Sequence, residues 1–207
     1  MNNKSVNTAD CGLSDFITFH SHTFVILPRK LHTEEILRLS PEEFAAADKI
    51  PLVVVLDDVR SLHNVGSVFR TADAYRVQQV VLCGITATPP QPEIHKTALG
   101  AEFTVDWRYF ADANEAVDAL KRDGFTVLAI EQAEGSIGFE QITPTKGEKI
   151  AVVLGNEVKG VQQSVIDRCD ACLELPQYGT KHSLNVSVTA GIVIYEMANR
   201  LGVKNKE

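Results

Sequence analysis

Side chains able to bind a ligand or position a reacting group gather in three separated segments of this chain. They are HNVGSVFRTADA at 63–74, LGNEVKG at 154–160 and LPQYGTKHSLNVSVTAGIVIYE at 175–196. Each begins at or just after an apolar run typical of a β-strand, and each places Gly, Asn, Ser or a charged residue where the chain should turn toward a helix. Ligands of open α/β sheets bind at the carboxyl ends of the strands. The three segments therefore predict one shared ligand site.

The first segment carries the most specific chemistry. Asn64 is expected to cap a helix through its side-chain oxygen, and Gly66 precedes Arg70 by one helical turn on the same face. The missing side chain at Gly66 is expected to leave a slot in front of Arg70 for a planar or anionic group. Arg70 lies in a largely apolar helix, where an unpaired buried guanidinium is costly. The alternative is a structural ion pair with one of three acidic residues, Asp57, Asp58 or Asp73.

Three common catalytic and nucleotide-binding motifs are missing from the sequence. The stretch between the first predicted strand and its helix has a single glycine, so it is no GxGxxG dinucleotide fingerprint. Neither a phosphate-binding GxxxxGK[ST] loop nor a GxSxG serine hydrolase motif is present. Nucleotide-phosphate binding and acyl transfer are thus disfavoured.

Composition and charge limit the choice of partners. The 207 residues are 44% apolar and 23% charged, which is typical of one soluble globular domain. No apolar stretch approaches the roughly 20 residues that span a bilayer, and the first residues lack a signal-peptide core, so we expect a cytoplasmic protein without membrane contact. A net charge of −7 has the wrong sign for gripping a phosphate backbone broadly, so any nucleic-acid contact must be local. The candidate basic residues are Arg29, Lys30, Arg60, Arg70, Arg76, Lys96, Lys159 and Lys181.

The cysteines predict no metal site. Cys169 and Cys172 form a CxxC pair, but no second pair supplies the four ligands that structural zinc needs. A redox CxxC normally opens a helix, whereas this one leads into a predicted strand, so we expect two reduced, partly buried thiols.

The first 50 residues read as a tail followed by a small helical extension. Residues 1–22 are polar and patternless, and a short apolar stretch follows at 24–27. Thr33 is a candidate helix cap, with glutamates in the next turn. Ser40 before a proline, with Glu43 at the third helical position, predicts a second helix with a capping box. We expect residues 1–50 to pack on the domain at 51–207.

From residue 51 the pattern alternates between strands and helices. The predicted strands are 52–56, 79–83, 103–107, 125–130, 150–154 and 171–175. The predicted helices are 65–75, 114–122, 162–168 and 185–201. Continuous apolar strands separated by helices indicate a mostly parallel sheet of about six strands with helices on both faces, which is an α/β fold.

The three segments, in this order, resemble the motifs of the SpoU, or TrmH-like, RNA 2'-O-ribose methyltransferases of the SPOUT class. The likeness covers about residues 51–201, although Arg60, Ser61 and Leu62 stand where the family often has Asp-Pro before its asparagine. It implies a deep C-terminal trefoil knot, an obligate homodimer and an S-adenosylmethionine pocket inside the knot. By the resemblance, the cofactor contacts are Leu154, Gly155, Leu175, Gly179 and Leu184.

The resemblance also assigns catalytic residues, namely Asn64, Arg70, Glu157, Ser183 and Asn185. Arg70 would hold the phosphate beside the target ribose or, coupled to that phosphate, act as the base. Glu157 and Asn64 would orient Arg70 or the ribose, and Ser183 and Asn185 would shape the pocket. Two of these residues also have structural interpretations: Glu157 at the positive end of a short helix, and Ser183 as the cap of the last helix. Lys181 and His182 are candidates for RNA contact. The substrate implied by the resemblance is tRNA or rRNA.

The last predicted helix is apolar on nearly every side, so its whole surface must be covered. A second subunit, or the rest of the same chain, could cover it. Two other functions stay open beside RNA methylation: a catalytically silent RNA-binding or assembly factor on the same fold, and a methyltransferase for a small molecule.

Overall fold

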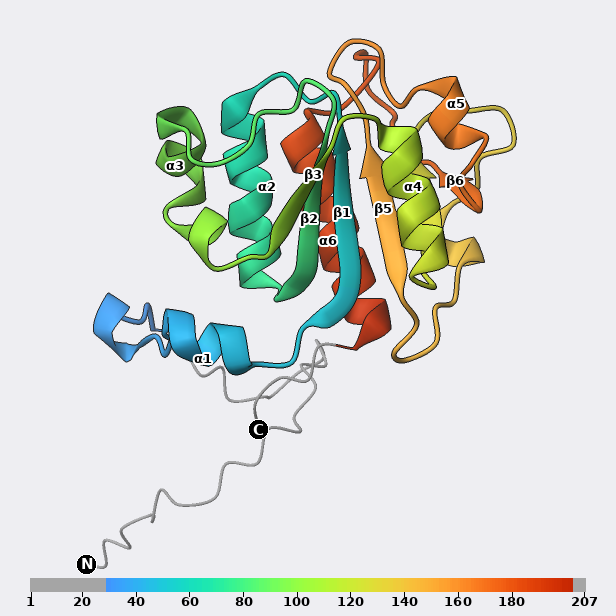
Figure 1. Ribbon diagram of the computed structural model, residues 1–207. Coiled ribbons are helices and arrows are strands. Elements are labelled where there is room, and N and C mark those ends of the chain that lie inside the picture. Colours follow the sequence, from blue (N-terminus) through green and yellow to red (C-terminus); the bar gives the residue numbers. More distant parts are fainter. Residues whose placement is uncertain (1–28, 203–207) are drawn as a thin grey trace, which may run out of the picture. The chain divides into compact units, whose positions relative to one another are not determined.

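A computed structural model of the chain describes residues 29–202 (Figure 1). The chain divides into two compact units, which meet in the sequence between Arg38 and Leu39. The expected tail at 1–22 and the apolar stretch at 24–27 lie outside the described residues. No helix in the described part of the chain is long and apolar enough to cross a membrane.

The described residues of the first unit contain one 3-10 turn, η1 (Thr33–Glu35). The residue at its amino-terminal cap is His32, so the expectation that Thr33 caps a helix is wrong. The Glu35 carboxylate accepts the backbone N–H of His32 at 2.7 Å and pairs with the Arg29 guanidinium at 2.7 Å. Glu35 therefore satisfies the N–H group at the start of this turn.

The second unit is built on a six-stranded parallel sheet in the order β3-β2-β1-β5-β4-β6. Its strands are β1 (Ile50–Asp57), β2 (Val77–Cys83), β3 (Trp107–Phe110), β4 (Thr126–Ile130), β5 (Ile150–Leu154) and β6 (Ala171–Leu173). The predicted α/β class and parallel sheet are confirmed. All strands but β3 lie within or around the apolar runs that predicted them.

Helices cover both faces of this sheet (Figure 1). One face carries α2 (Leu62–Ala74), α3 (Pro92–Ala98) and α6 (Val186–Leu201), and the other carries α4 (Ala113–Arg122) and α5 (Gln163–Ile166). Along β1, Leu52, Val54 and Leu56 pack with α2 and α6. Val53 and Val55 point the opposite way and pack with α4 and α5. Because both faces are buried, the strand is continuously apolar.

The helix α1 (Pro41–Ala46) begins where its capping signal predicted. The Ser40 hydroxyl accepts the Glu43 N–H at 3.2 Å, and the Glu43 carboxylate accepts the Ser40 N–H at 2.8 Å. Phe44 is buried in the core, and the ammonium of Lys49 lies 4.2 Å from the centre of its ring. These contacts make α1 part of the second unit.

The strand predicted at 103–107 is wrong for most of its length. A 3-10 turn, η2 (Ala101–Phe103), occupies its beginning, and β3 starts only at Trp107. The buried Glu102 carboxylate accepts the N–H of Gly100 at 3.1 Å. This side-chain contact stabilises a turn where the β-branched composition favoured a strand.

Two further elements, α3 and β6, also differ from the prediction. The helix α3 has no counterpart among the predicted helices, although it begins with proline and carries Glu93 in its first turn, both ordinary start signals. The strand β6 ends at Leu173, short of the predicted 171–175.

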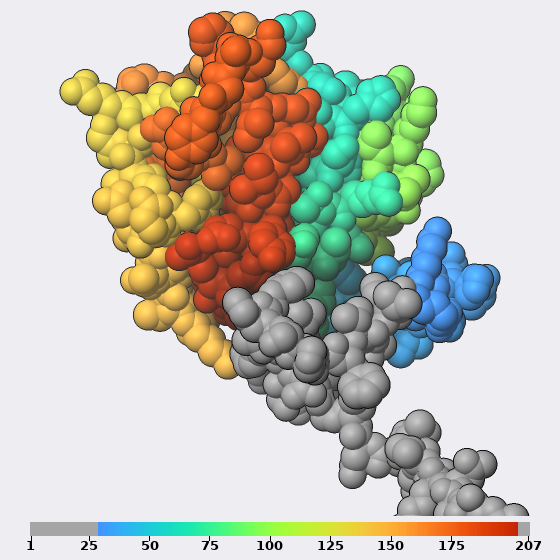
Figure 2. Space-filling view, turned by 180° about the vertical axis from the view of Figure 1, so that it is seen from behind, coloured from blue at the N-terminus to red at the C-terminus, as the bar shows by residue number. Residues whose placement is uncertain are grey.

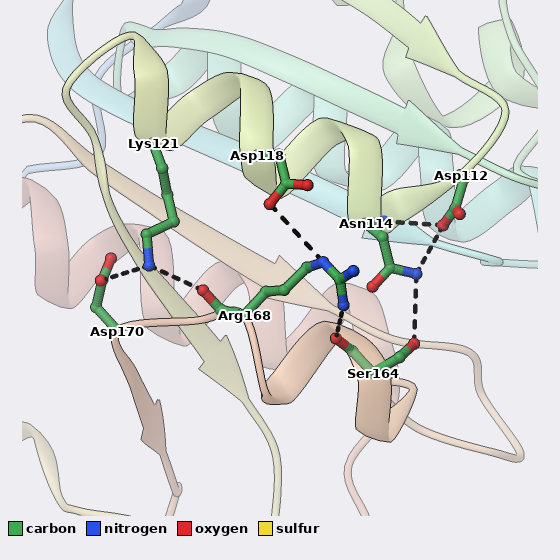
Figure 3. Close-up of polar contacts among 7 residues, drawn as sticks. All are labelled: Asp112, Asn114, Asp118, Lys121, Ser164, Arg168 and Asp170. Atoms are coloured by element: carbon green, nitrogen blue, oxygen red, sulfur yellow. Dashed lines mark hydrogen bonds and ion pairs between the residues drawn. The ribbon is translucent and has the colours of Figure 1, made fainter.

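A polar network ties α4 to α5 and to the start of β6 (Figure 3). Lys121 Nζ donates to the carbonyl of Arg168 at 2.9 Å and pairs with the Asp170 carboxylate at 2.7 Å. Asn114 Nδ2 donates to the Ser164 hydroxyl at 3.3 Å. The network fixes the chain between β5 and β6, next to the loop that enters the site described below.

Candidate active site

A pocket of about 500 Å³ lies at the carboxyl ends of β4 and β5. Its walls are the residues directly after β4, the loop 154–160 and the segment 175–189. Pockets for small molecules typically measure about 300–1,000 Å³. The second and third segments singled out in the sequence therefore line one cavity of suitable size.

Most of the residues expected to contact a cofactor line this pocket. They are Leu154, Gly155, Leu175 and Leu184. Gly179 lies on the same segment as Leu184, but it is not among the lining residues, and a Cβ atom there would meet nothing within 4 Å. The geometry therefore supports four of the expected contacts and gives no support for Gly179.

The loop after β5 is a tight turn that folds back on itself. Asn156 and Gly160 exchange two backbone hydrogen bonds of 2.9 and 3.1 Å, and the Asn156 side chain accepts the N–H groups of Val158 and Lys159. A Cβ atom on Gly155 would lie 2.1 Å from the Gly160 carbonyl carbon. Glycine is thus required here for backbone-to-backbone packing, which shapes the pocket wall before any ligand arrives.

Glu157 connects this loop to the amino end of α2. Its carboxylate accepts the backbone N–H groups of Arg60 and Ser61 at 2.9 and 3.0 Å, and the Asn64 amide at 3.0 Å. These are unpaired donors at the positive end of a helix, where a carboxylate is favoured. Glu157 thus stabilises the amino end of α2, a long helix of another segment and not a short helix, and its contact with Asn64 also joins two of the three segments.

The protonation of Glu157 follows from these contacts. Partial burial by itself raises the pKa of the carboxyl, but the hydrogen bonds from Arg60, Ser61 and Asn64 outweigh burial, and the pKa is lowered. Glu157 is therefore ionised at neutral pH. It is suited to anchoring its neighbours and poorly suited to accepting a proton.

Asn64 bridges the three segments but does not cap α2. The cap is Ser61, whose hydroxyl accepts the Asn64 N–H at 3.3 Å, so the predicted role of the Asn64 side chain is wrong. Because the helix starts earlier than predicted, the Asn64 amide is free to donate to Glu157 and to accept from Asn185 Nδ2 at 3.2 Å. One side chain thus contacts both other segments.

Asn185 caps α6 and fixes the end of the third segment. Its side-chain oxygen accepts the N–H of Ser187 at 2.9 Å and the hydroxyl of Ser187 at 2.7 Å. The proposed capping role of Ser183 is therefore wrong; Ser183 is exposed and lines the pocket together with His182. Lys181, just before them, is exposed but is not a lining residue.

The slot expected beside Gly66 does not exist. A Cβ atom at Gly66 would lie 2.2 Å from Thr97 Oγ1 and 2.3 Å from the carbonyl oxygen of Ile94. The missing side chain lets α2 and α3 pack closely, so no space is left for a ligand.

Arg70 differs most from the sequence prediction. It is exposed on α2, and within residues 29–202 it forms no hydrogen bond or ion pair, so the alternative of an ion pair with Asp57, Asp58 or Asp73 is wrong. It is also absent from the pocket lining. The guanidinium is therefore free to bind an anion from outside its own chain.

Several lining residues were not singled out in the sequence, chiefly Glu131 and Gln132 directly after β4. They follow an apolar run, as the three segments do, and that position at the carboxyl end of a strand was the available signal. The residues around Glu131 and Gln132 match no known motif. Periodicity alone therefore does not distinguish these two residues from those of an ordinary surface loop.

The acidic, His and Cys side chains of the described residues can be tested for a metal site. Within residues 29–202 no group of three or more His, Cys, Asp or Glu side chains is arranged to hold a metal ion. Cys169 and Cys172 are free and partly buried, and burial raises the pKa of the Cys169 thiol to about 12.

Fold and site together define a class of protein: a parallel α/β domain whose small-molecule pocket is walled by the turn after β5 and the loop before its last helix. The SpoU rRNA methylase family model matches residues 51–195. The chain belongs to this family.

Three similar proteins illustrate the relationship. The chain is 30% identical to the 23S rRNA (guanosine-2'-O-)-methyltransferase RlmB of Neisseria meningitidis, over 86% of this chain and 67% of the relative. It is 32% identical to a tRNA (guanosine(18)-2'-O)-methyltransferase of Thermus thermophilus, over 81% and 80%. Among solved structures, an AdoMet-bound rRNA methyltransferase from Sinorhizobium meliloti matches with 27% identity and a TM-score of 0.69, over 80% of this chain and 62% of that one. The chain thus spans between about three fifths and four fifths of the length of these relatives.

Proposed function

We propose that this protein is an S-adenosylmethionine-dependent methyltransferase that modifies a ribose 2'-hydroxyl in tRNA or rRNA. The observation that carries the proposal is the hydrogen-bonded series Glu157–Asn64–Asn185, which joins all three motif segments beside one pocket. One relative is named for rRNA and another for tRNA, so both classes of RNA are candidate partners. The cytoplasm, where both RNAs are abundant, is the proposed site of action.

The pocket suits the proposed cofactor in size and chemistry. Leu154, Leu175 and Leu184 offer apolar surfaces for an adenine ring, and the turn that starts at Gly155 offers main-chain polar groups. When bound, S-adenosylmethionine supplies a methyl group on a sulfonium centre that an oxygen nucleophile can displace. The knot implied by the family resemblance would pass the third segment through the chain near this pocket.

We assign the domain boundaries accordingly. The methyltransferase domain is proposed at 51–207 and the appended segment at 1–50. The family match, which begins at residue 51, supports the start of this domain, while α1 in the appended segment packs as part of the second compact unit, which begins at Leu39.

The chemical roles follow from where each side chain lies. Methyl transfer needs the ribose oxygen about 3–3.5 Å from the methyl carbon and in line with its leaving bond. Arg70 is proposed to hold the phosphate next to the target ribose, where its positive charge lowers the proton affinity of the 2'-hydroxyl. Glu157 and Asn64 hold the amino end of the helix that carries Arg70, while Ser183 and Asn185 shape the mouth of the pocket.

A homodimer would bring Arg70 to a cofactor pocket. The outer side of α6, together with Leu184 just before its cap, exposes four large apolar side chains at helical spacing (Leu184 41%, Val188 51%, Ile192 42% and Tyr195 53%). In Figure 2, α6 runs along the middle of the face toward the viewer, next to α2. A second copy is proposed to cover this stripe symmetrically. Arg70, exposed on the adjacent α2, would then serve the pocket of the partner subunit.

The basic test uses labelled cofactor and RNA without modifications. We expect the wild type to label tRNA or rRNA, and Arg70→Ala to abolish labelling while cofactor binding persists. Cofactor binding without transfer to any RNA would favour the silent RNA-binding factor or the small-molecule enzyme.

A mixing experiment tests the contribution of Arg70 across the dimer. Ser183→Trp should fill the pocket from an exposed position, and both it and Arg70→Ala should be inactive as pure proteins. After random subunit exchange, half of the dimers pair one variant with the other and each has one complete site, so about a quarter of wild-type activity should return. If Arg70 acts within its own chain, mixing restores nothing.

A further inference from the structure

Glu131 and Gln132 directly follow β4, and both line the pocket. Neither belongs to the three motif segments. Their side chains contact opposite walls of the pocket: Glu131 contacts the loop after β5, and Gln132 contacts the segment before α6.

Glu131 holds the far end of the loop after β5. One carboxylate oxygen accepts the N–H of Val161 at 2.9 Å, and the other accepts the N–H of Gln132 at 2.9 Å. Gly160 has a φ of +67°, and a Cβ atom there would lie 2.1 Å from Glu131 Oε2. Glycine at this position therefore lets the carboxylate reach Val161, whose side chain is buried in the core.

Gln132 holds the other wall. Its Nε2 donates to the carbonyl oxygen of His182 at 2.8 Å. Within the described part of the chain, this is the only hydrogen bond formed by the segment 175–184. That segment includes the lining residues Leu175 and Leu184, and its next fixed point is the cap at Asn185.

Core packing does not account for these contacts. Gln132 is exposed and Glu131 is half-buried. An exposed glutamine ordinarily keeps its amide in water, because fixing a long side chain costs rotamer entropy. Here the amide is fixed on a backbone oxygen beside the pocket.

We propose that Glu131 and Gln132 are positioning residues that brace the two walls of the pocket, so that the cofactor binds to preformed loops. The inference rests on the proposed function, since it assigns these residues to the cofactor site. The hydrogen bond from Gln132 restrains ten residues, so its loss lets the segment 175–184 open, and binding must then order it again. Losing the net contribution of one hydrogen bond corresponds to roughly a fivefold loss of cofactor affinity.

The test combines binding with proteolysis. Lys181 is exposed, and trypsin would cut the peptide bond between Lys181 and His182. His182 is the residue whose carbonyl accepts the hydrogen bond from Gln132. We expect Gln132→Ala to weaken S-adenosylmethionine binding about fivefold and to speed cleavage after Lys181. The methylation rate at saturating cofactor should stay unchanged, because the reacting groups are intact.

Two substitutions at the same position separate the hydrogen bond from side-chain size. Gln132→Glu keeps the shape but cannot donate, so it should behave like Gln132→Ala. Gln132→Lys can still donate and should restore slow cleavage and cofactor affinity. The matched control is Gln91→Ala, because Gln91 is also an exposed glutamine, and its side chain makes no capping hydrogen bond at the start of α3.

Glu131 tests the second half of the brace. Glu131→Ala should weaken cofactor binding, because it frees the loop after β5. Cleavage after Lys181 should not become faster, because that residue lies in the other wall. A melting curve shows whether this variant is folded, and Glu131→Gln, which keeps one oxygen acceptor, should lose less affinity.

The outcomes are distinguishable from those of the proposed function. Wild-type cleavage and affinity in Gln132→Ala, or wild-type behaviour of Gln132→Glu, would overturn the brace while RNA methylation stands. A wild-type protein that binds no S-adenosylmethionine would overturn the proposed function and, with it, the cofactor role of the brace. The rate of cleavage after Lys181 would then report only whether Gln132 holds the loop.

Discussion

Replacing Asn64 by aspartate tests whether the three motif segments are held together as the structure indicates. The amide of Asn64 donates to Glu157 at 3.0 Å and accepts from Asn185 at 3.2 Å. Asn64→Asp keeps the acceptor for Asn185 and nearly the same volume. It also places a second carboxylate at hydrogen-bond distance from an ionised one.

The expected cost follows from this geometry. Two unit charges about 4 Å apart repel by about 1 kcal/mol in bulk water and by about 4 kcal/mol at an effective dielectric constant near 20. The site is partly exposed, so the true value lies between these limits. Asn64→Ala loses both hydrogen bonds without adding charge, at about 1 kcal/mol for each. At neutral pH we therefore expect Asn64→Asp to be the less stable variant.

The pH dependence separates repulsion from the loss of contacts. A neighbouring carboxylate raises the pKa of the pair in the folded state, and stability from a raised acid pKa is present at low pH and lost as pH rises through it. The melting temperature of Asn64→Asp should thus fall relative to Asn64→Ala between about pH 4 and pH 7. For a domain of this size, 1 kcal/mol corresponds to about 2–4 °C.

Thermal melts of both variants across this pH range, with methylation measured beside them, complete the assay. Activity should be lost in both variants, because each breaks the link between α2 and the pocket loops. Equal melting temperatures for the two variants at every pH would show that Asn64 does not face Glu157, and the account of the site would be wrong.

Three further outcomes follow from the structure. Burial, and then the charge of a neighbouring aspartate, raise the pKa of Asp57, which is 1% exposed. Asp57→Asn should therefore stabilise the protein at neutral pH. In melts at low pH the wild-type carboxyl is protonated and its burial no longer costs stability, so the gain should vanish. An equal gain at both pH values would contradict this. Gly66→Ala should force α2 away from Ile94 and lower the free energy of unfolding by about 1–3 kcal/mol in urea titrations; no loss would mean that the helices are not in close contact. Ile192→Glu should give a monomer in sedimentation with its melting curve little changed, whereas a persistent dimer would place the interface elsewhere.

Much of the fold could be predicted because its signals are local. A strand buried on both faces must be apolar throughout, and 150–154 was predicted with the bounds that β5 has. The capping box at Ser40 likewise involves residues three apart. The prediction failed at 103–107, where a buried carboxylate, Glu102, stabilises a turn. Whether that side chain is buried depends on packing that no short window of sequence contains.

The site divides in the same way. Its location followed from the rule that ligands bind at the carboxyl ends of parallel strands, and the pocket lies there. Which of the site residues are buried and which are exposed could not be predicted from that rule. The sequence around Arg70 is apolar, yet Arg70 lies on the exposed side of α2, because the buried face of that helix is formed by Val65, Val68, Phe69 and Ala72.

The order and chemistry of the three segments, by themselves, determined the family and the edge of the sheet at which to look. Only the tertiary structure decided that Glu157 meets Asn64, that Asn64 meets Asn185, and that two residues outside any motif hold the pocket walls. The physical reason is distance along the chain: a periodic pattern reports which face a residue takes within its own element. The hydrogen bonds that build this site join residues 93 and 121 positions apart, and their partners are fixed only when the sheet assembles.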